Sequence, residues 1–466
     1  MASHARSDRL EQRPEAGEVD SSPARGLTLE QRRDPAYVPP LPMAIALGVQ
    51  HVLAMFVSNI TPPIIVAGAA GFGFGSPDPS ALIYMIQAAM LFAGVATLLQ
   101  TVGLGPIGAR LPLVQGTSFA FISVMIPIVA GKGVEGMAAL TTAAFLAGLL
   151  HAGLSRLVGP IRFALPPLVT GLVVLMIGLS LVRVGIEYAA GGVALRGHPA
   201  YGSLESWALA GVVVVTTLGL KFFGRGVFST AAVLLGLLVG YGAALVMGKV
   251  DFAPVGQAHW VMLPHFLAFG WALSPSAIVG FCLIGFVSSI ESIGDVEAIC
   301  ENGAGRRASD REVMGAVAAD GVGTALSALF GAMPNTTFSQ NVGLIAMSGL
   351  MSRFVVTLGA LFLIVCGLLP KIGAVITTVP IEVLGGGVIV MFGMVASSAI
   401  AMLSGVVWNQ RNMLIGGTAL SLALGLQLEP EALGHLPETA RILLSSGVMP
   451  VAVIAVVLNL ILPQEI

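Results

Sequence analysis

Three carboxylates stand in apolar stretches of this chain, where a charge is costly. Glu291 and Asp295 lie in the run 286–297, and Asp320 lies in the run 317–323. An ionised side chain at the centre of a membrane helix costs about 2.5–3.5 kcal/mol, so such a residue normally faces a cavity and serves substrate or ion binding. Glu291 and Asp295 are four residues apart and share a helix face, where the repulsion between two negative charges favours a proton on one of them. We therefore predict that this pair takes part in binding or proton uptake.

Asp320 and His51 each allow two interpretations. Asp320 either hydrogen-bonds the backbone of a neighbouring broken segment or takes part in proton coupling. His51 is a lone polar residue in the first apolar span and is either a satisfied core histidine or a ligand contact. The three cysteines (282, 300 and 366) have no CxxC spacing, so we expect free thiols and neither a metal site nor another cofactor.

A polar stretch at 334–349 (Pro-Asn-Thr-Thr-Phe-Ser-Gln-Asn-Val-Gly-Leu-Ile-Ala-Met-Ser-Gly) lies between two long apolar segments. Polar, irregular backbone is tolerated at bilayer depth only where it is buried in protein or lines a cavity. The stretch 111–122 (Leu-Pro-Leu-Val-Gln-Gly-Thr-Ser-Phe-Ala-Phe-Ile) has the same pattern: a short extended piece carrying Gln and Gly, then a half-length apolar helix. The alternative is a pair of ordinary kinked helices.

Paired interrupted segments in the two halves of a membrane protein indicate a transporter site near the bilayer midplane. The N-termini of the two half-helices would direct backbone N–H groups and a partial positive charge toward an anionic or acceptor-rich ligand. The sequence therefore predicts a small-molecule site between these two stretches.

The composition is that of a polytopic membrane protein. Of 466 residues, 56% are hydrophobic and 10% are charged, and the mean hydropathy is +0.92. A soluble protein carries about 25% charged residues, so this chain lacks the polar surface to be one. The net charge of −2 is uninformative about nucleic acid, but the sequence has no basic patch with interleaved aromatic residues, so we expect no nucleic-acid partner.

Apolar runs of about 20 residues, the length needed to cross a bilayer, follow one another from Leu41 onward. We predict fourteen spans: 41–66, 80–103, 117–131, 135–155, 164–185, 206–223, 226–248, 274–299, 311–332, 340–350, 353–370, 382–404, 411–427 and 444–463. The third and tenth are too short to cross alone. Because they are seven spans apart, the two halves of the chain run in opposite orientations.

The segments outside these spans complete the expected architecture. Residues 252–272 are apolar but contain prolines and histidines, which predicts a re-entrant or surface helix. Residues 1–37 are polar, of mixed charge and without the apolar run of a signal peptide, so we expect a disordered tail. Lys and Arg are more frequent in the breaks assigned to the inside, which predicts cytoplasmic termini in the plasma (inner) membrane.

The stretch 340–349 resembles the signature of the nucleobase–ascorbate transporters, also called nucleobase:cation symporter-2 or xanthine/uracil permeases. That signature is Gln, Glu or Pro, then Asn, any residue, Gly, four more residues, Thr, and Arg, Lys or Gly. Ser348 stands where Thr is usual and keeps the hydroxyl. Further matches are Gln50-His51, the run 115–119, Glu291 with Asp295, and Asp320. The resemblance covers residues 41–463.

The resemblance implies an all-α membrane fold of fourteen segments in two inverted seven-segment repeats. Segments 1–4 and 8–11 (residues 41–157 and 251–370) would form a core domain, and segments 5–7 and 12–14 (158–250 and 371–463) a gate domain. The pieces before the third and tenth half-helices would pair as two antiparallel strands beside the substrate. It further implies an elevator motion of core against gate, proton coupling with sodium not excluded, and a homodimer.

The resemblance also implies roles for individual residues. Glu291 and Gln340 would hydrogen-bond the base, the Phe119 ring would stack on it, and backbone N–H groups near Phe119, Ser339 and Gln340 would complete the contacts. Gln at the first signature position is typical of purine carriers, and Glu of uracil carriers. Ala120 stands where many xanthine-selective members have an amide, and would leave room for the extra oxo group of urate.

Supporting and coupling roles fall to His51, Asp295, Asp320 and Asn341, with Gly343 the signature glycine. Asp295 is also purine-like, because uracil carriers tend to have His at that position. We therefore predict a proton-coupled uptake symporter for xanthine, urate or both, and not an enzyme.

Three alternatives to this prediction differ in substrate or in chemistry. A uracil permease of the same family differs only in the base that it carries. An anion transporter of the related inverted-repeat fold would place Glu291 where it repels the substrate. An intramembrane enzyme needs a paired Ser/Lys, HExxH or twin-Asp arrangement, and the sequence has none with catalytic spacing.

Overall fold

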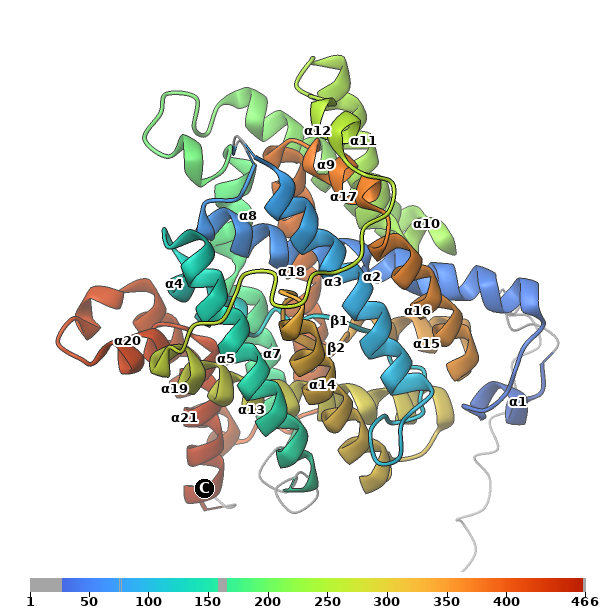
Figure 1. Ribbon diagram of the computed structural model, residues 1–466. Coiled ribbons are helices and arrows are strands. Elements are labelled where there is room, and N and C mark those ends of the chain that lie inside the picture. Colours follow the sequence, from blue (N-terminus) through green and yellow to red (C-terminus); the bar gives the residue numbers. More distant parts are fainter. Residues whose placement is uncertain (1–26, 75, 77, 158–165, 464–466) are drawn as a thin grey trace, which may run out of the picture.

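The structure is a computed structural model that describes residues 27–463 except 75, 77 and 158–165. Within that part the chain is almost entirely helical (Figure 1). The long helices are α2 (Leu41–Ala70), α3 (Ser80–Thr101), α5 (Gly133–Leu154), α9 (Leu204–Phe223), α13 (Pro275–Ile299), α14 (Asp310–Leu329), α18 (Ile381–Ser404) and α19 (Gln410–Leu428). Shorter helices are α4 (Ile122–Val129), α7 (Pro167–Ser180), α8 (Val182–Ala189), α10 (Val227–Thr230), α11 (Ala232–Val246) and α15 (Gln340–Ser348).

Two further spans are bent. Helices α16 (Arg353–Gly367) and α17 (Pro370–Thr377) meet at 76°, and α20 (Glu438–Leu444) and α21 (Val448–Ile461) meet at 79°. Among the described residues, seven helices are long and apolar enough to cross a membrane, and up to nine when each bent pair is counted as one span. The chain is therefore a mostly helical, multi-pass membrane protein.

The segment predicted as a re-entrant or surface helix contains only one helical turn. Helix α12 covers Ala253–Gln257, and the chain then runs without regular structure to α13. In Figure 1 this segment is the yellow-green coil that crosses the outside of the molecule. The prediction of a re-entrant or surface helix was therefore wrong for most of 252–272: Pro264 has no backbone donor, and the N–H groups of Met262 and Leu267 bond to the Leu368 and Leu329 carbonyls instead of to a helix of their own segment.

Part of the N-terminal segment expected to be disordered is ordered in the structure. Helix α1 (Leu29–Arg33) begins with a capping box between Thr28 and Gln31. The carbonyl of Arg32 accepts a hydrogen bond from the Met351 N–H (2.8 Å), which attaches this segment to the loop between α15 and α16. Residues 1–26, the rest of the expected tail, lie outside the described residues.

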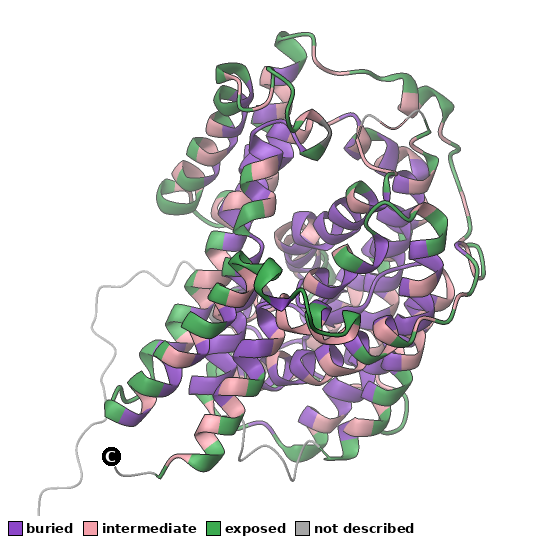
Figure 2. Ribbon diagram, turned by 90° about the vertical axis from the view of Figure 1, so that its left-hand side faces the viewer, coloured by how far each residue is buried: buried purple, intermediate pink, exposed green. Residues whose placement is uncertain are grey.

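The helices pack in two groups. The first contains α2, α3, α5, α13, α14 and α16, and the second contains α7, α8, α9, α11, α18, α19 and α21. Figure 2 shows buried residues where these helices face one another and exposed residues on their outward faces. Helix α17 packs on α3, with Gly373 against Ile83, so it joins the first group although the expected boundary at 370/371 places it in the second.

Glycines allow the helices within each group to approach closely. A Cβ at Gly148 would lie 2.6 Å from the Ala325 backbone nitrogen in the first group, and one at Gly385 would lie 2.1 Å from that of Ala189 in the second. Between the groups, a Cβ at Gly294 would meet only the flexible end of Met402, at 3.2 Å. Small residues at helix contacts permit such close backbone packing in membranes. Each group is therefore tightly interlocked at these positions.

This packing predicts a strong difference between two glycines of α18. Gly385→Ala forces a methyl group into the α8 backbone, and overpacking of this kind costs about 1–3 kcal/mol. Gly393→Ala is the control, because nothing lies within 4 Å of its Cβ position. We expect thermal unfolding of the purified protein in detergent to shift to a clearly lower temperature for Gly385→Ala only. Equal unfolding temperatures for the two variants would contradict the packing.

Candidate functional site

The two interrupted segments meet as a pair of antiparallel strands, β1 (Gln115–Thr117) and β2 (Asn335–Thr337). The register places Gln115 opposite Thr337, Gly116 opposite Thr336 and Thr117 opposite Asn335. One more backbone hydrogen bond extends the pair at each end, from Ser118 N–H to the Pro334 carbonyl (2.8 Å) and from Phe338 N–H to the Val114 carbonyl (3.0 Å). The paired strands satisfy each other's backbone groups in the protein interior, as backbone that is not helical must at membrane depth.

Gly116 and Asn59 hold the first strand in place. A Cβ at Gly116 would lie 2.5 Å from the Phe338 ring, so only glycine lets that ring cover the strand. The Asn59 side-chain oxygen on α2 accepts hydrogen bonds from the Thr117 N–H (2.9 Å) and hydroxyl (3.1 Å). Strand β1 is thereby fixed to α2.

Asp320 connects four elements of the first helix group. Its Oδ1 accepts hydrogen bonds from Gln100 Nε2 on α3 (3.0 Å) and Gln115 Nε2 on β1 (2.6 Å), and its Oδ2 accepts one from the Ser292 hydroxyl on α13. The Asp320 side chain is fully buried. It therefore positions strand β1, and it does so through side chains rather than through the backbone of the broken segments.

His51 and Asn341 form a second connection, away from the cavity described below. His51 Nδ1 is hydrogen-bonded to Asn341 Oδ1, and Asn341 Nδ2 donates to the Pro112 carbonyl (2.8 Å). Both side chains are buried. The arrangement ties the first turn of α15 to α2 and to the chain that leads into β1.

Four of the five predicted substrate residues line one small cavity between the two helix groups. Glu291, Gln340, Phe119 and Ser339 form it together with Thr336 and Phe338, and α7 and α18 close it from the other side with Val174, Ile177, Val395 and Ser398. The Phe119 ring also meets the edge of Phe392 on α18, at a centroid distance of 5.5 Å.

Ala120, the fifth predicted residue, does not line this cavity. Its side chain is fully buried in the hydrophobic core, two residues before α4. The structure therefore gives no support to the expectation that Ala120 leaves room for part of a ligand.

The cavity contains polar groups without a protein partner. Glu291 Oε2 is buried and has no hydrogen-bond partner among the described residues. Within that same part of the chain, the backbone N–H groups of Ser339 and Gln340 at the start of α15 have no acceptor. A buried polar group without a partner is costly, and a ligand that pairs with it recovers that cost. The cavity thus offers a carboxylate acceptor, backbone donors, an amide and an aromatic face.

A larger vestibule of about 900 Å³ leads to the cavity and shares Ser339 and Ser398 with it. Asp295, whose Oδ2 accepts a hydrogen bond from the Ser339 hydroxyl (3.0 Å), lines the vestibule, as does Gly343. Glu297 lines it as well. The site is therefore approached from the face that carries the loop between α13 and α14.

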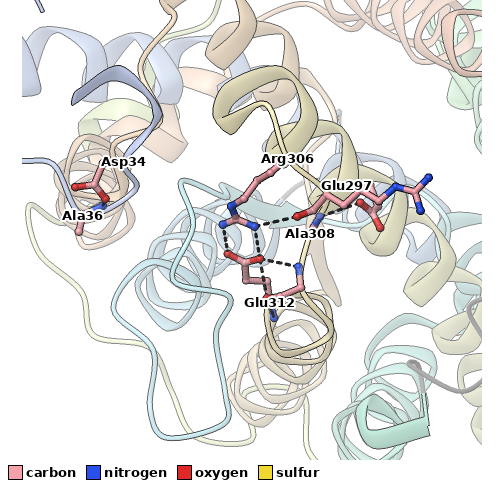
Figure 3. Close-up of polar contacts among 8 residues, drawn as sticks. Asp34, Ala36, Glu297, Arg306, Ala308 and Glu312 are labelled. Atoms are coloured by element: carbon pink, nitrogen blue, oxygen red, sulfur yellow. Dashed lines mark hydrogen bonds and ion pairs between the residues drawn. The ribbon is translucent and has the colours of Figure 1, made fainter. Parts of the chain in front are cut away.

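Hydrogen bonds to two carboxylates, one of them in a bidentate ion pair, hold that loop in place (Figure 3). Arg306 donates to both carboxylate oxygens of Glu312 (2.6 and 2.8 Å), and the Ala308 N–H donates to Glu297 (3.1 Å). Glu312 also forms the capping box of α14 with Ser309. The part of the vestibule wall formed by Arg307 and Ala308 is thus tied to the start of α14.

Two substitutions of Glu312 separate its two roles. Glu312→Gln keeps a side chain that fits the capping box and loses the ion pair, and an exposed ion pair contributes about 0.2–1 kcal/mol. Glu312→Ala loses both interactions, and we expect a further loss of about 1 kcal/mol. Thermal unfolding in detergent should rank wild type above Gln and Gln above Ala. An Ala variant as stable as the Gln variant would show that the capping box does not contribute to the stability of the protein.

Sequence reasoning missed several residues that position the site. Asn59 and Gln100 are polar side chains within apolar spans, and that signal could have found them. Ser398 and Val395, which face the cavity from the second helix group, carry no signal in the sequence. The three cysteines form no disulfide bond, and no group of three or more His, Cys, Asp or Glu residues in the described part of the chain could hold a metal ion.

A multi-pass helical protein with a polar cavity at two broken segments belongs to the class of membrane transporters. Solved structures show a similar fold: the transmembrane domain of the cyanobacterial bicarbonate transporter BicA (TM-score 0.56, 14% identity, 90% of this chain and 96% of that one) and SLC26A9 (TM-score 0.58, 13% identity, 84% and 63%). At these identities the likeness concerns the fold alone.

Sequence comparison gives the family. The model described as Permease family matches residues 43–432. The chain is 38% identical to the putative purine permease CPE0397 of Clostridium perfringens over 91% of each chain. It is 36% identical to the uric acid permease PucJ of Bacillus subtilis (89% of this chain, 91% of the relative) and 34% identical to the xanthine permease XanP of Escherichia coli (92% and 93%). The chain belongs to the nucleobase–ascorbate transporters, the xanthine/uracil permease family, and it is a transporter rather than an enzyme.

Proposed function

We propose that this protein is a proton-coupled symporter that takes up a purine base, urate or xanthine. The observation that carries the proposal is the cavity in which Glu291, with one unpaired carboxylate oxygen, and Gln340 lie with Phe119 between the two helix groups. The relatives with the names uric acid permease and xanthine permease support purines as the substrate class.

The chemistry of the cavity suits the edge of a purine. Such an edge alternates N–H donors and C=O acceptors in one plane. The Glu291 carboxylate accepts from the donors, whereas the Gln340 amide both donates and accepts. The N–H groups of Ser339 and Gln340 pair with a base carbonyl, and Phe119 supplies an aromatic face for stacking. A base with a different donor and acceptor order leaves buried groups unpaired and is rejected.

The remaining predicted residues support this site. Asp320 fixes strand β1, and the pair of His51 and Asn341 fixes the start of α15. Asp295 bonds to Ser339 at the mouth of the cavity, where it is placed to exchange a proton with the vestibule. Gly343 lines that vestibule without a side chain that would narrow it.

We further propose that the first helix group moves as a core against the second group as a gate, carrying the base across the membrane as in an elevator. Two observations support two bodies that slide past each other. Glycines pack closely inside each group, whereas between the groups Gly294 faces only the flexible end of the Met402 side chain. In this proposal the two halves of the chain are inverted repeats of seven segments, the termini are cytoplasmic, and two copies form a homodimer. A proton on Glu291 or Asp295 accompanies each base, and sodium is the alternative ion.

Uptake of radiolabelled xanthine, urate and uracil in cells that lack their own purine permeases tests the substrate. We expect uptake of xanthine, urate or both, inhibited by unlabelled purine and not by uracil. Uptake of uracil alone would replace the purine proposal with the uracil permease of the same family. Uptake of bicarbonate or sulfate without any base would assign the chain to the anion carriers that share its fold.

A further inference from the structure

A second cavity lies at the surface between the two helix groups, apart from the polar site. It is a groove of about 370 Å³ between Phe56 on α2, Val375 on α17, Leu238 on α11 and Leu384 on α18. All of its thirteen lining residues are apolar except Tyr241 and Lys371. Leu238 is 56% exposed and Val375 is 43% exposed, so the groove opens outward. In a multi-pass membrane protein an apolar surface between two spans faces the acyl chains of the bilayer.

One cation lies at the groove. Lys371, in the first turn of α17, lines it, and its ammonium group donates a hydrogen bond to the Val255 carbonyl and lies 5.4 Å from the centroid of the Trp260 ring. An ammonium group has three donors, so donors remain beyond the one used by Val255. Among the described residues no carboxylate forms an ion pair with Lys371. The charge thus has no anionic partner in the described part of the chain, and an anionic ligand at the groove would supply one.

Neighbouring aromatic residues place this cation at the level of the lipid headgroups. The segment after α12 exposes Trp260 (75%), which lies at Lys371, and Trp271 (46%), and tryptophan is enriched at membrane–water interfaces. In Figure 1, α12 and α17 lie at the upper end of the molecule, opposite the C-terminus. From this level the groove follows α11 from Tyr241 to Leu234, a rise of about 10 Å, toward the middle of α2. A groove of this length along a helix can hold part of an acyl chain.

We propose that the groove binds one anionic phospholipid, with an acyl chain along α11 and α17 and the phosphate at Lys371. The apolar lining would contact the acyl chain, and the ammonium group with the neighbouring Trp260 would bind the headgroup. The lipid would lie between the two helix groups. On the proposed elevator function it would also set how easily they slide, but the binding itself does not depend on that function.

Binding is tested by native mass spectrometry of the purified full chain titrated with phosphatidylglycerol or phosphatidylcholine. Lys371→Gln removes the charge, Val375→Trp fills the groove, and Lys132→Gln is a control for the loss of one lysine elsewhere. We expect the wild type and the control to retain one phosphatidylglycerol in preference to phosphatidylcholine. Lys371→Gln should weaken phosphatidylglycerol binding about fivefold and remove the preference, and Val375→Trp should lose both lipids.

Unchanged phosphatidylglycerol binding in both variants would overturn the proposal, as would equal retention of the two lipids by the wild type. Because the readout is bound lipid and not transport, a protein that transports no purine could still bind the lipid, and the two proposals fail separately. Size-exclusion chromatography of each variant shows that it remains folded. A groove variant that does not fold is replaced by Ile372→Trp, which fills the same groove from α17.

Discussion

Glu291→Gln is expected to abolish accumulation of the base against its gradient while leaving the protein folded. The amide keeps the size and an acceptor of the carboxylate but cannot take up a proton with the base. For a base that is carried in its neutral form, such as xanthine, one accompanying proton is worth about 2.3 kcal/mol per 100 mV, which corresponds to roughly a 50-fold concentration ratio. In the variant we expect this ratio to fall to about one. Radiolabelled purine uptake into energised vesicles measures it.

The control for this substitution is Glu301→Gln, which removes a carboxylate from the vestibule beyond the end of α13. Glu301 is exposed and lies outside the cavity, so the control should accumulate purine as the wild type does. Uphill uptake retained by Glu291→Gln would exclude Glu291 from proton coupling, although the residue could still bind the base.

Asp320→Asn is expected to destabilise the protein and to stop transport. The carboxylate accepts hydrogen bonds from Gln100, Gln115 and Ser292, whereas an asparagine presents an NH₂ group to at least one of these donors. Hydrogen bonds to a charged group contribute about 1.5–3 kcal/mol each, so we expect a loss of about 2–4 kcal/mol. Thermal unfolding in detergent measures the stability, and base uptake corrected for the amount of folded protein measures the transport.

Ser292→Ala is the matched comparison, because it removes one of the three donors and leaves the charge in place. Its loss of stability should be smaller than that of Asp320→Asn. If Asp320→Asn were as stable as the wild type and still transported purine, strand β1 would have to be held by other contacts, such as that between Asn59 and Thr117.

Much of the helical architecture was predictable from apolar length alone. The span predicted at 80–103 is α3 (Ser80–Thr101), and the span at 382–404 is α18 (Ile381–Ser404). Burial in lipid demands about 20 apolar residues, so hydropathy marks such helices directly. The interrupted segments were also visible, because Gln115 and Gln340 are polar where the bilayer demands apolar residues. This signal led to the cavity that contains Glu291.

Features that depend on packing were not predictable from the sequence. The 76° bend between α16 and α17 leaves α17 on α3, and no residue pattern at 367–370 states which group it joins. The contribution of Ser398 from α18 depends on how the two groups face each other. Ala120 shows a limit of the resemblance: its match to a position where many xanthine-selective members have an amide suggested the cavity, but the residue, two positions before α4, is buried in the hydrophobic core.

Accumulation of purine by purified protein in liposomes tests the central claim most directly. Radiolabelled urate and xanthine are supplied outside, a proton gradient directed inward is imposed, and a protonophore is then added. The account predicts that at least one of the two purines accumulates above its external concentration, that the protonophore releases it, and that uracil does not compete. Uracil accumulating in place of both purines, or purine accumulation that is unaffected by the protonophore, would contradict it.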